Sequence, residues 1–175
     1  EIKKLVKEEP LGGIIVLATE AEIQDLKIFD KLNVPVVVLD SFFRDAKYDT
    51  VVINNMQGSY QGTRYLLEKG HTSIGYLCSS IRINNFEERK DGFFKALKDY
   101  NIEWNEAIAY PLEPTMDGAY RDMARILETG CKLPTAFFSD NDIIACGAMK
   151  AFKEKGLRIP EDLSIVGFDD MPFSK

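Results

Sequence analysis

Short apolar segments alternate with amphipathic stretches along most of this chain. The apolar segments are four or five residues long and rich in β-branched and aromatic residues, which is typical of buried strands. The predicted strands are Ile14–Ala18, Val36–Asp40, Val51–Asn54, Ile74–Cys78, Ala107–Tyr110, Ala136–Ser139 and Ile165–Phe168. Between most of them, apolar residues recur three, four or seven positions apart, as they do on one face of a helix.

This spacing predicts amphipathic helices between the strands. They cover, in chain order, residues 23–32, 86–100, 117–127 and 142–152. Asp117 and Asp142 are expected to cap the last two helices, and Gly130 and Gly156 to end them. Strands that are apolar on both faces and alternate with helices indicate a parallel sheet covered by helices on each side.

One junction interrupts this alternation. Val36–Asp40 is followed by the stretch SFFRDAKYDT and then by Val51–Asn54, which leaves no room for a covering helix. A strand that leaves its sheet and enters a second one would explain the missing helix. We therefore predict two α/β subdomains, with residues 1–53 in a partial N-terminal one and residues 54–175 in a C-terminal one.

Composition and charge restrict the classes of function. The net charge is −6 and the longest basic stretches are pairs, which argues against this segment binding a nucleic-acid backbone by itself. No run of eighteen apolar residues occurs, so no membrane span is predicted. The chain begins with Glu1 and not with Met, and we expect it to be a fragment of a longer protein.

The cysteines indicate a reducing compartment. Cys78, Cys131 and Cys146 are odd in number and lie in apolar surroundings. We expect them to be buried, reduced thiols in a cytoplasmic protein and not parts of a secreted disulfide scaffold.

Polar residues follow almost every predicted strand. In open α/β sheets, ligands bind outside the carboxyl ends of the strands. The polar groups at these ends are Thr19-Glu20, Asp40-Ser41, Asn54-Asn55, Ser79-Ser80, Asp140-Asn141-Asp142 and Asp169-Asp170. Each one taken singly fits a loop residue or a helix cap. Taken together, they offer carboxylates and amides that can hydrogen-bond hydroxyl groups.

One cation and several aromatic residues are expected near the same edge. Arg89 lies in the first turns of the helix after Ile74–Cys78, and its planar fork can bridge two ligand oxygens. Periodicity alone favours a solvated helix-face residue for Arg89. Phe86 and Phe173 are candidates to stack on an apolar ring, with core packing as the alternative. Trp104 fits a cover over a hydrophobic edge as well as a binding residue.

Enzyme motifs are weak in this sequence. It contains no nucleotide-binding glycine motif and no nucleophile elbow, and we expect no cofactor. His71 is the only histidine and no C-x-x-C occurs, so no metal site is expected. The acidic groups at 140–142 and 169–170 resemble those of aspartate-nucleophile phosphatases, but the chain between them is too short to carry the Ser/Thr and Lys that such enzymes need. We therefore expect no catalytic residues.

A set of motifs closely resembles the effector-binding core of the lactose/galactose-repressor (LacI/GalR) family of bacterial transcription regulators. The motifs are VPVVVLD, GTRYLLEKGHTSIGYL, RKDGFFKAL and PTAFFSDNDIIACGAMKAFKEKGLRIPEDLSIVGFDDMPFS. The resemblance runs from Gly12 to Lys175 and is most specific from Pro134 to Ser174. It implies two doubly wound, parallel-sheet α/β subdomains of periplasmic-binding-protein-like type, the first incomplete here, with a small effector, usually a sugar, between them.

The resemblance also implies partners. Members of this family act as homodimers that hold operator DNA through a helix-turn-helix headpiece, which is absent from this chain. They are cytoplasmic regulators and not enzymes. A periplasmic sugar-binding protein of an ABC transporter shares the fold and is the alternative, but the cysteines expected to be buried weigh against export.

Site residues follow from the resemblance position by position. Asp169 matches the carboxylate that hydrogen-bonds the effector, and Arg89 matches the arginine that clamps it. Asn85 and Asn141 match polar effector contacts, and Asp40 matches a carboxylate of the N-terminal subdomain. Phe86 and Phe173 stay candidates for stacking. Asp170 and Asp142 are assigned to capping and loop geometry.

The sequence departs from the family pattern in two ways. The opening βα units and the segments that return to the first subdomain are missing, so one of three crossovers is present, near Ile53. The glycine expected after the fourth predicted strand is replaced in the stretch LCSSI, where Ser79 or Ser80 must form a different turn. The loop before Asn84 could therefore place its ligand contacts differently.

Overall fold

The computed structural model describes residues 11–104 and 108–174. Contacts divide the chain into two compact units. The first extends to Asn54 and includes Ile83–Asn85, and the second comprises Asn55–Arg82 and the chain from Phe86 onward. The sequence had placed the boundary one residue earlier, and it gave no sign that Ile83–Asn85 would group with the first unit.

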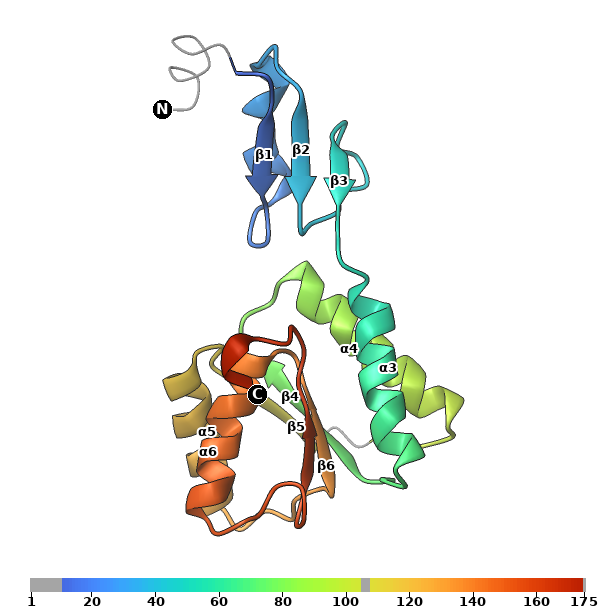
Figure 1. The fold of residues 1–175 in the computed structure, drawn as a ribbon, viewed down its shortest axis with the longest axis vertical. Helices are drawn as coiled ribbons and strands as arrows, with labels where there is room; N and C mark the ends of the chain where they lie inside the picture. Colours follow the sequence, from blue (N-terminus) through green and yellow to red (C-terminus); the bar gives the residue numbers. More distant parts are fainter. Residues whose placement is uncertain (1–10, 105–107, 175) are drawn as a thin grey trace. The chain divides into compact units, whose positions relative to one another are not determined.

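The first unit contains a small parallel sheet. Its described strands are β1 (Ile14–Leu17), β2 (Val36–Leu39) and β3 (Asp49–Val51), in the order β1-β2-β3 (Figure 1). The expected exchange of sheets at the third strand is wrong, because β3 pairs with β2 through Val38 and Thr50. The strand also lies earlier than predicted and ends at Val51.

Aromatic side chains replace a covering helix between β2 and β3. Tyr48 and Phe43 pack against a buried cluster of Ala18, Leu26 and Val38. The Tyr48 hydroxyl donates to the Leu26 carbonyl at 3.0 Å. The loop is therefore anchored without a helix, which explains how two parallel strands follow each other so closely in the sequence.

The predicted first helix is shorter than expected. The structure has α2 (Ile23–Leu26), followed by the 3-10 helix η1 (Phe29–Lys31), in place of one helix over residues 23–32. The Tyr48 hydroxyl lies within hydrogen-bond distance of both the Leu26 carbonyl (3.0 Å) and the Asp30 carboxylate (2.7 Å), so it occupies the region where the helix would have continued.

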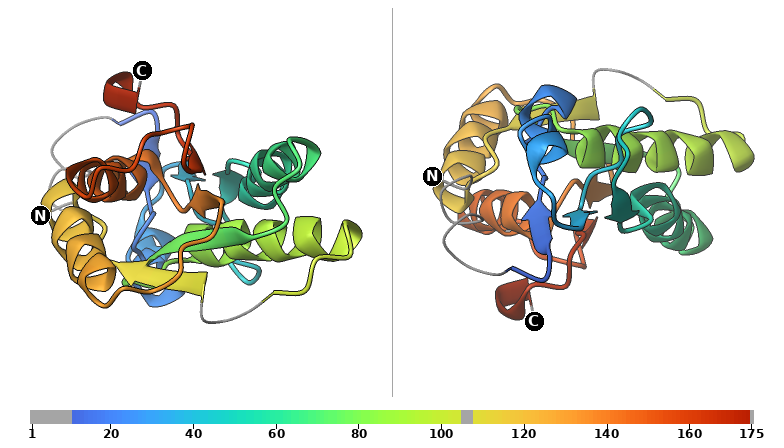
Figure 2. Two further views of the ribbon diagram at one scale, coloured as in Figure 1. Left: turned by 90° about the horizontal axis from the view of Figure 1, so that it is seen from below. Right: turned by 90° about the horizontal axis from the view of Figure 1, so that it is seen from above.

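The second unit is a larger parallel sheet with helices on both faces. The described strands β4 (Ile74–Ser79), β5 (Ala109–Leu112), β6 (Ala136–Ser139) and β7 (Ser164–Val166) have the order β5-β4-β6-β7. Helices α3 (Asn55–Glu68) and α4 (Asn84–Asp99) cover one face, while α5 (Met116–Glu128) and α6 (Asp142–Glu154) cover the other (Figures 1 and 2). The predicted Ala107 start of β5 lies outside the described residues.

Neighbouring residues in the central strands build the two cores. Tyr76 and Phe138 point into the layer of α3 and α4, whereas Leu77 and Phe137 belong to the layer of α5 and α6. This division follows from the two-residue period of a strand, which sends successive side chains to opposite faces. Tyr76 stacks on Phe93 of α4 with 4.9 Å between ring centroids.

Gly92 brings α4 against α3. A Cβ atom added at Gly92 would overlap the Ser59 hydroxyl and the Met56 carbonyl oxygen in the first turns of α3. The close neighbour of Gly92 is therefore the other helix and not the sheet. The contact ties the beginning of α3 to α4.

Two predicted helix caps belong to neighbouring residues. Thr115, and not Asp117, caps α5 by accepting the Gly118 N–H at 3.0 Å. Asn141, and not Asp142, caps α6 by accepting the Ile144 N–H at 2.9 Å. An N-cap residue must be extended while its successors are helical, and Thr115 and Asn141 meet this condition.

Two further expectations concern helix ends and thiols. Gly130 and Gly156 follow α5 and α6 with φ values of 69° and 82°, as predicted for helix-ending glycines. The expected burial of the thiols is wrong for Cys131, which is exposed, while Cys78 and Cys146 are partly buried. In the described chain, no helix is long and apolar enough to span a membrane.

Candidate functional site

The second unit has a topological switch point between β4 and β6. These strands are neighbours, but α4 follows β4 on one face of the sheet and α6 follows β6 on the other. The connections therefore diverge where the strands end, which is where α/β sheets bind ligands. The residues at this edge include Ser79 at the end of β4, and Asp140 and Asn141 after β6.

Arg89 is the centre of a polar cluster at this edge. Its side chain reaches from α4 and is 5% exposed. Its Nε donates to Asn55 Oδ1 at 2.9 Å, and its Nη1 donates to the Asp140 carbonyl at 2.6 Å. Its Nη2 lies 3.3 Å from Asp169 Oδ1. The alternative of a solvated helix-face arginine is therefore wrong, and the two residues expected to share a site do lie together.

Aromatic rings enclose the guanidinium. The Phe168 ring centroid lies 3.8 Å from the Arg89 Cζ, and that of Phe86 lies 5.6 Å away. Such contacts are favourable because the face of a π system attracts a cation. Phe86 therefore contacts the guanidinium directly. Any stacking of Phe86 on a ligand stays a prediction.

The loop after β7 carries Asp169 in an uncommon conformation. Asp169 and Asp170 have φ values of 101° and 54°, in the left-handed region that non-glycine residues rarely adopt. Asp142 holds this loop from the start of α6. Its N–H donates to the Phe168 carbonyl at 2.9 Å, and its carboxylate accepts the Met171 N–H at 2.8 Å.

Asp142 therefore serves loop geometry, as predicted, although it does not cap α6. A Cβ atom at Gly167 would overlap the Asp142 carboxylate, so a glycine is needed there for the carboxylate to reach the loop. The two adjacent acids have different roles. Asp169 pairs with the Arg89 guanidinium, and Asp170 forms part of the turn that places Asp169. Strained backbone held by specific contacts is common at ligand sites.

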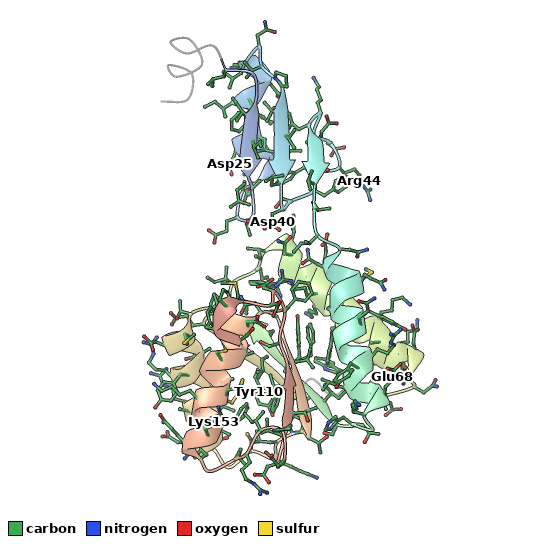
Figure 3. All side chains as sticks on the ribbon, in the orientation of Figure 1. Asp25, Asp40, Arg44, Glu68, Tyr110 and Lys153 are labelled. Carbon is green, nitrogen blue, oxygen red and sulfur yellow. The ribbon has the colours of Figure 1, made fainter. Side chains whose placement is uncertain are left out.

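The other predicted residues are placed as follows. Asn141 is buried and its Oδ1 is used by the α6 cap. Asn85 is buried in the first turn of α4 and groups with the first unit. Asp40 follows β2 in the first unit, with φ of 67°, and accepts the Thr19 hydroxyl at 2.6 Å (Figure 3). Their roles toward an effector stay predictions.

Phe173 lies beside a different cavity. An open cavity of about 1020 Å³ between α6 and the segment after β7 is lined by Phe173 and Asp169 and by helix side chains such as Met149 and Lys153. Its lining is divided between α6 and residues of the later segment from Ile159 to Ser174. We place the candidate site at Arg89 instead, because buried polar groups from α3, α4 and two strand ends converge there.

Asp140 is a buried acid beneath the candidate site. Its carboxylate accepts the Tyr76 hydroxyl, and the Ser79 N–H at 2.6 Å. Burial raises the pKa of the Asp140 carboxyl to about 6, although both hydrogen bonds and the nearby Arg89 act in the opposite direction. Burial and the Asp140 carboxylate also raise the pKa of the Tyr76 hydroxyl.

Sequence reasoning missed the supporting residues. Asn55 was noted only as one of the polar strand-end residues, and Asp140 only as part of an acidic triplet. The signal for Asp140 was its position directly after a fully buried strand, where an acid needs partners. For Asn55 no local signal exists, because its partner Arg89 is far along the chain.

At the end of β4, where the family pattern has a glycine, the chain turns with the help of Ser79. Ser79 Oγ accepts the Ile81 N–H at 3.0 Å, and the Ser80 N–H donates to the Leu112 carbonyl at 2.8 Å. A side-chain hydrogen bond thus forms the turn.

Trp104 packs edge-on against Phe94 with 4.8 Å between centroids, which fits a cover over a hydrophobic edge.

The chemistry available at this site is hydrogen bonding to a polar molecule. A guanidinium has five N–H donors, and in the described part of the chain three are engaged by Asn55, Asp140 and Asp169. The ion pair with Asp169 offsets the charge of Arg89, so the site suits neutral oxygen and nitrogen groups. Among residues 11–104 and 108–174, no cluster of three or more His, Cys, Asp or Glu could hold a metal ion.

Comparisons with known proteins fit this geometry. The family model described as a periplasmic binding protein-like domain matches residues 63–175. The chain is 33% identical over 171 residues to the HTH-type transcriptional repressor PurR of Actinobacillus pleuropneumoniae, and 34% identical over 175 residues to PurR of Haemophilus influenzae. These matches cover 98% of this chain and 50% and 51% of the relatives, so it spans about half their length.

Solved structures agree. A LacI-family sugar-binding transcriptional regulator from Escherichia coli, complexed with phosphate, superimposes with a TM-score of 0.84 at 28% identity, over 98% of this chain and 62% of its own. A LacI-family regulator from Enterococcus faecium with bound ribose gives 0.81 at 28% identity, over 95% and 61%. The chain belongs to the lactose/galactose-repressor family. The LacI/GalR relatives named here are transcription regulators and not enzymes.

The family membership confirms the predicted fold. The motifs quoted above had indicated LacI/GalR, and both sheets of the structure are parallel and accompanied by helices. The periplasmic-binding-protein-like fold class, with an incomplete first unit, is confirmed by the same comparisons.

Proposed function

We propose that this chain is the effector-binding and dimerisation domain of a bacterial LacI-type transcription regulator. The observation that carries the proposal is the buried Arg89 paired with Asp169 at the strand ends of the second unit. A buried arginine that is fixed by protein partners and still has donors to offer is suited to recognise a polar ligand.

The proposed effector is a small sugar-like metabolite with several hydroxyl groups. Asp169, Arg89, Asn141 and Asn85 would contact it from one side and Asp40 from the other. Two solved relatives support this class, one called sugar-binding and one with bound ribose. The name PurR, shared by both curated relatives reported above, makes a purine base the second candidate.

Regulation would follow from contacts with both subdomains. An effector that touches both binds the closed arrangement more tightly and shifts the population toward it. In a homodimer, this shift would alter the spacing of helix-turn-helix headpieces on operator DNA. Coupling of this kind is typically about 1–3 kcal/mol. The regulator would act in the cytoplasm, without a cofactor and without catalysis.

A periplasmic sugar-binding protein of an ABC transporter is the alternative, because it shares the fold. The names of the curated relatives, which are HTH-type transcriptional repressors, favour the regulator. The two readings differ in a measurable property, since only the regulator changes its affinity for DNA when the effector binds.

A thermal-shift screen of the intact protein tests the proposal. The panel contains sugars, sugar phosphates and purine bases, because a ligand that binds only the folded state raises the melting temperature. At 100 times its dissociation constant a ligand stabilises by about 2.7 kcal/mol, which is a shift of several degrees. We expect one class to do so and to change operator affinity. If no member stabilises the protein, the proposed effector classes are wrong.

A further inference from the structure

The Asn55 side chain bridges two consecutive residues of α4. Its Oδ1 accepts the Arg89 Nε–H at 2.9 Å, and its Nδ2 donates to Glu88 Oε2 at 2.9 Å. Asn55 is 1% exposed, so water does not replace these partners. Both ends of the amide are therefore used, and the orientation of the amide plane is set by two opposite requirements.

This contact fixes the plane of the guanidinium. Nε is the donor nearest the aliphatic stem, while Nη1 and Nη2 are engaged by the Asp140 carbonyl and by Asp169. Because a guanidinium is planar, three contacts on three different nitrogens define its position. Loss of the Nε acceptor would leave a buried donor without a partner, so the side chain would have to move.

The start of α3 is itself firmly placed. Gly92 lets the Ser59 hydroxyl and the Met56 carbonyl approach the α4 backbone so closely that no larger residue fits. Asn55 is the first residue of α3, and it directly follows Asn54, where the first unit ends. The oxygen that accepts the Arg89 Nε–H therefore belongs to Asn55, the residue at which the chain enters the second unit.

We propose that Asn55 is a positioning residue for Arg89. It links the orientation of the Arg89 guanidinium to the crossover between the two units, which ends at the start of α3. Its effect on effector affinity rests on the function proposed above, whereas its effect on the guanidinium does not. A ligand that hydrogen-bonds to Arg89 and moves its guanidinium then also acts on the start of α3, through the buried Asn55 amide.

The deciding measurement needs no ligand. Hydrogen exchange of arginine Nε–H groups is followed by NMR in the intact protein with labelled arginine. We expect the Nε–H of Arg89 to exchange at least tenfold more slowly than that of Arg125, whose side chain is 75% exposed. Equal exchange rates in the wild-type protein would overturn the proposal without any variant.

Three variants extend this measurement. Asn55→Ala should accelerate exchange of the Arg89 Nε–H at least tenfold. Asn55→Asp combined with Glu88→Gln keeps an acceptor for the Nε–H and avoids two facing carboxylates, so it should largely preserve the protection. Asn33→Ala is the matched control, because Asn33 is exposed and lies in the first unit. Unchanged protection in Asn55→Ala would contradict the proposal. If Asn55→Ala does not fold, faster exchange in the Asn55→Asp/Glu88→Gln protein than in Asn33→Ala would contradict it instead.

A double-mutant cycle separates positioning from general stability. D-ribose and the common purine bases serve as probes for affinity. Asn55→Ala should weaken binding at least tenfold in the wild-type background, but less than twofold in Arg89→Lys, which has no Nε–H fork to position. Equal weakening in both backgrounds would mean a merely structural role. If no probe binds the wild type, the proposed effector classes fail while the exchange result stands.

Discussion

Asp140 shows how a single residue ties the candidate site to the stability of the fold. The residue is 1% exposed. Its carboxylate accepts hydrogen bonds from the Tyr76 hydroxyl and the Ser79 N–H, and its backbone carbonyl accepts one from Arg89. Its pKa rises from 3.8 to about 6 because the folded protein removes it from water. The acid therefore opposes folding when it is ionised.

Replacing this acid should change the pH dependence of stability. A carboxyl whose pKa is raised in the folded state destabilises fully above about pH 6 and not at all below about pH 3.8. The free energy of unfolding of Asp140→Asn, minus that of the wild type, should therefore rise from pH 4 to pH 7 by up to about 3 kcal/mol. Urea denaturation at several pH values measures this difference. A difference independent of pH would contradict the assigned burial effect.

The sequence predicted the site residues unevenly. Arg89 and Asp169 came from family motifs, and the structure brings them within 3.3 Å. Periodicity alone misplaced Arg89 in solvent, since its burial depends on Asn55 and Asp140, which are 34 and 51 residues away in the chain. Local patterns report what one element prefers, whereas the burial of a charge is decided by distant partners.

At the scale of elements, the α3–α4 contact determines where the site residues stand. Both helices lie on one face of the sheet in the second unit (Figure 1), and at Gly92 they are too close for a larger residue. The same contact carries the Asn55 and Arg89 side chains toward each other. The packing of α3 against α4 therefore determines the geometry of the site in this unit.

Gly92→Ala should destabilise the second unit. The added methyl group would overlap the Met56 carbonyl oxygen, which is backbone and cannot rotate away. Overpacking of this kind costs about 1–3 kcal/mol. Gly12→Ala is the control, because nothing lies within 4 Å of its added Cβ. Chemical denaturation that shows equal stability for both variants would mean that α3 and α4 can separate at little cost.

Element prediction succeeded where the pattern was local. Periodicity predicted the strands of the second unit, and the two glycines predicted the ends of α5 and α6, where the structure has positive φ values. It failed between β2 and β3, where Tyr48 replaces a helix through a hydrogen bond to the Leu26 carbonyl. It also misassigned two caps by one or two residues, because the extended backbone that selects a cap is not visible in composition.

At the scale of the whole molecule, the account depends on one pair of residues. The family explains the parallel fold, and the proposed regulation requires that Arg89 and Asp169 hold the effector. A hydrogen bond from a charged group to a ligand is worth about 1.5–3 kcal/mol, so its loss should weaken binding by about tenfold to 150-fold. The substitutions must leave folding intact for this comparison.

Isothermal titration calorimetry of the intact protein makes the comparison directly. The titrant is the compound that gives the largest thermal shift in the screen. The proteins are the wild type, Arg89→Ala, Asp169→Ala and the control Arg64→Ala, which removes an arginine on α3 whose side chain is 45% exposed. We predict that Arg89→Ala and Asp169→Ala each weaken binding at least tenfold, and that Arg64→Ala binds like the wild type. Wild-type affinity in folded Arg89→Ala would contradict the account.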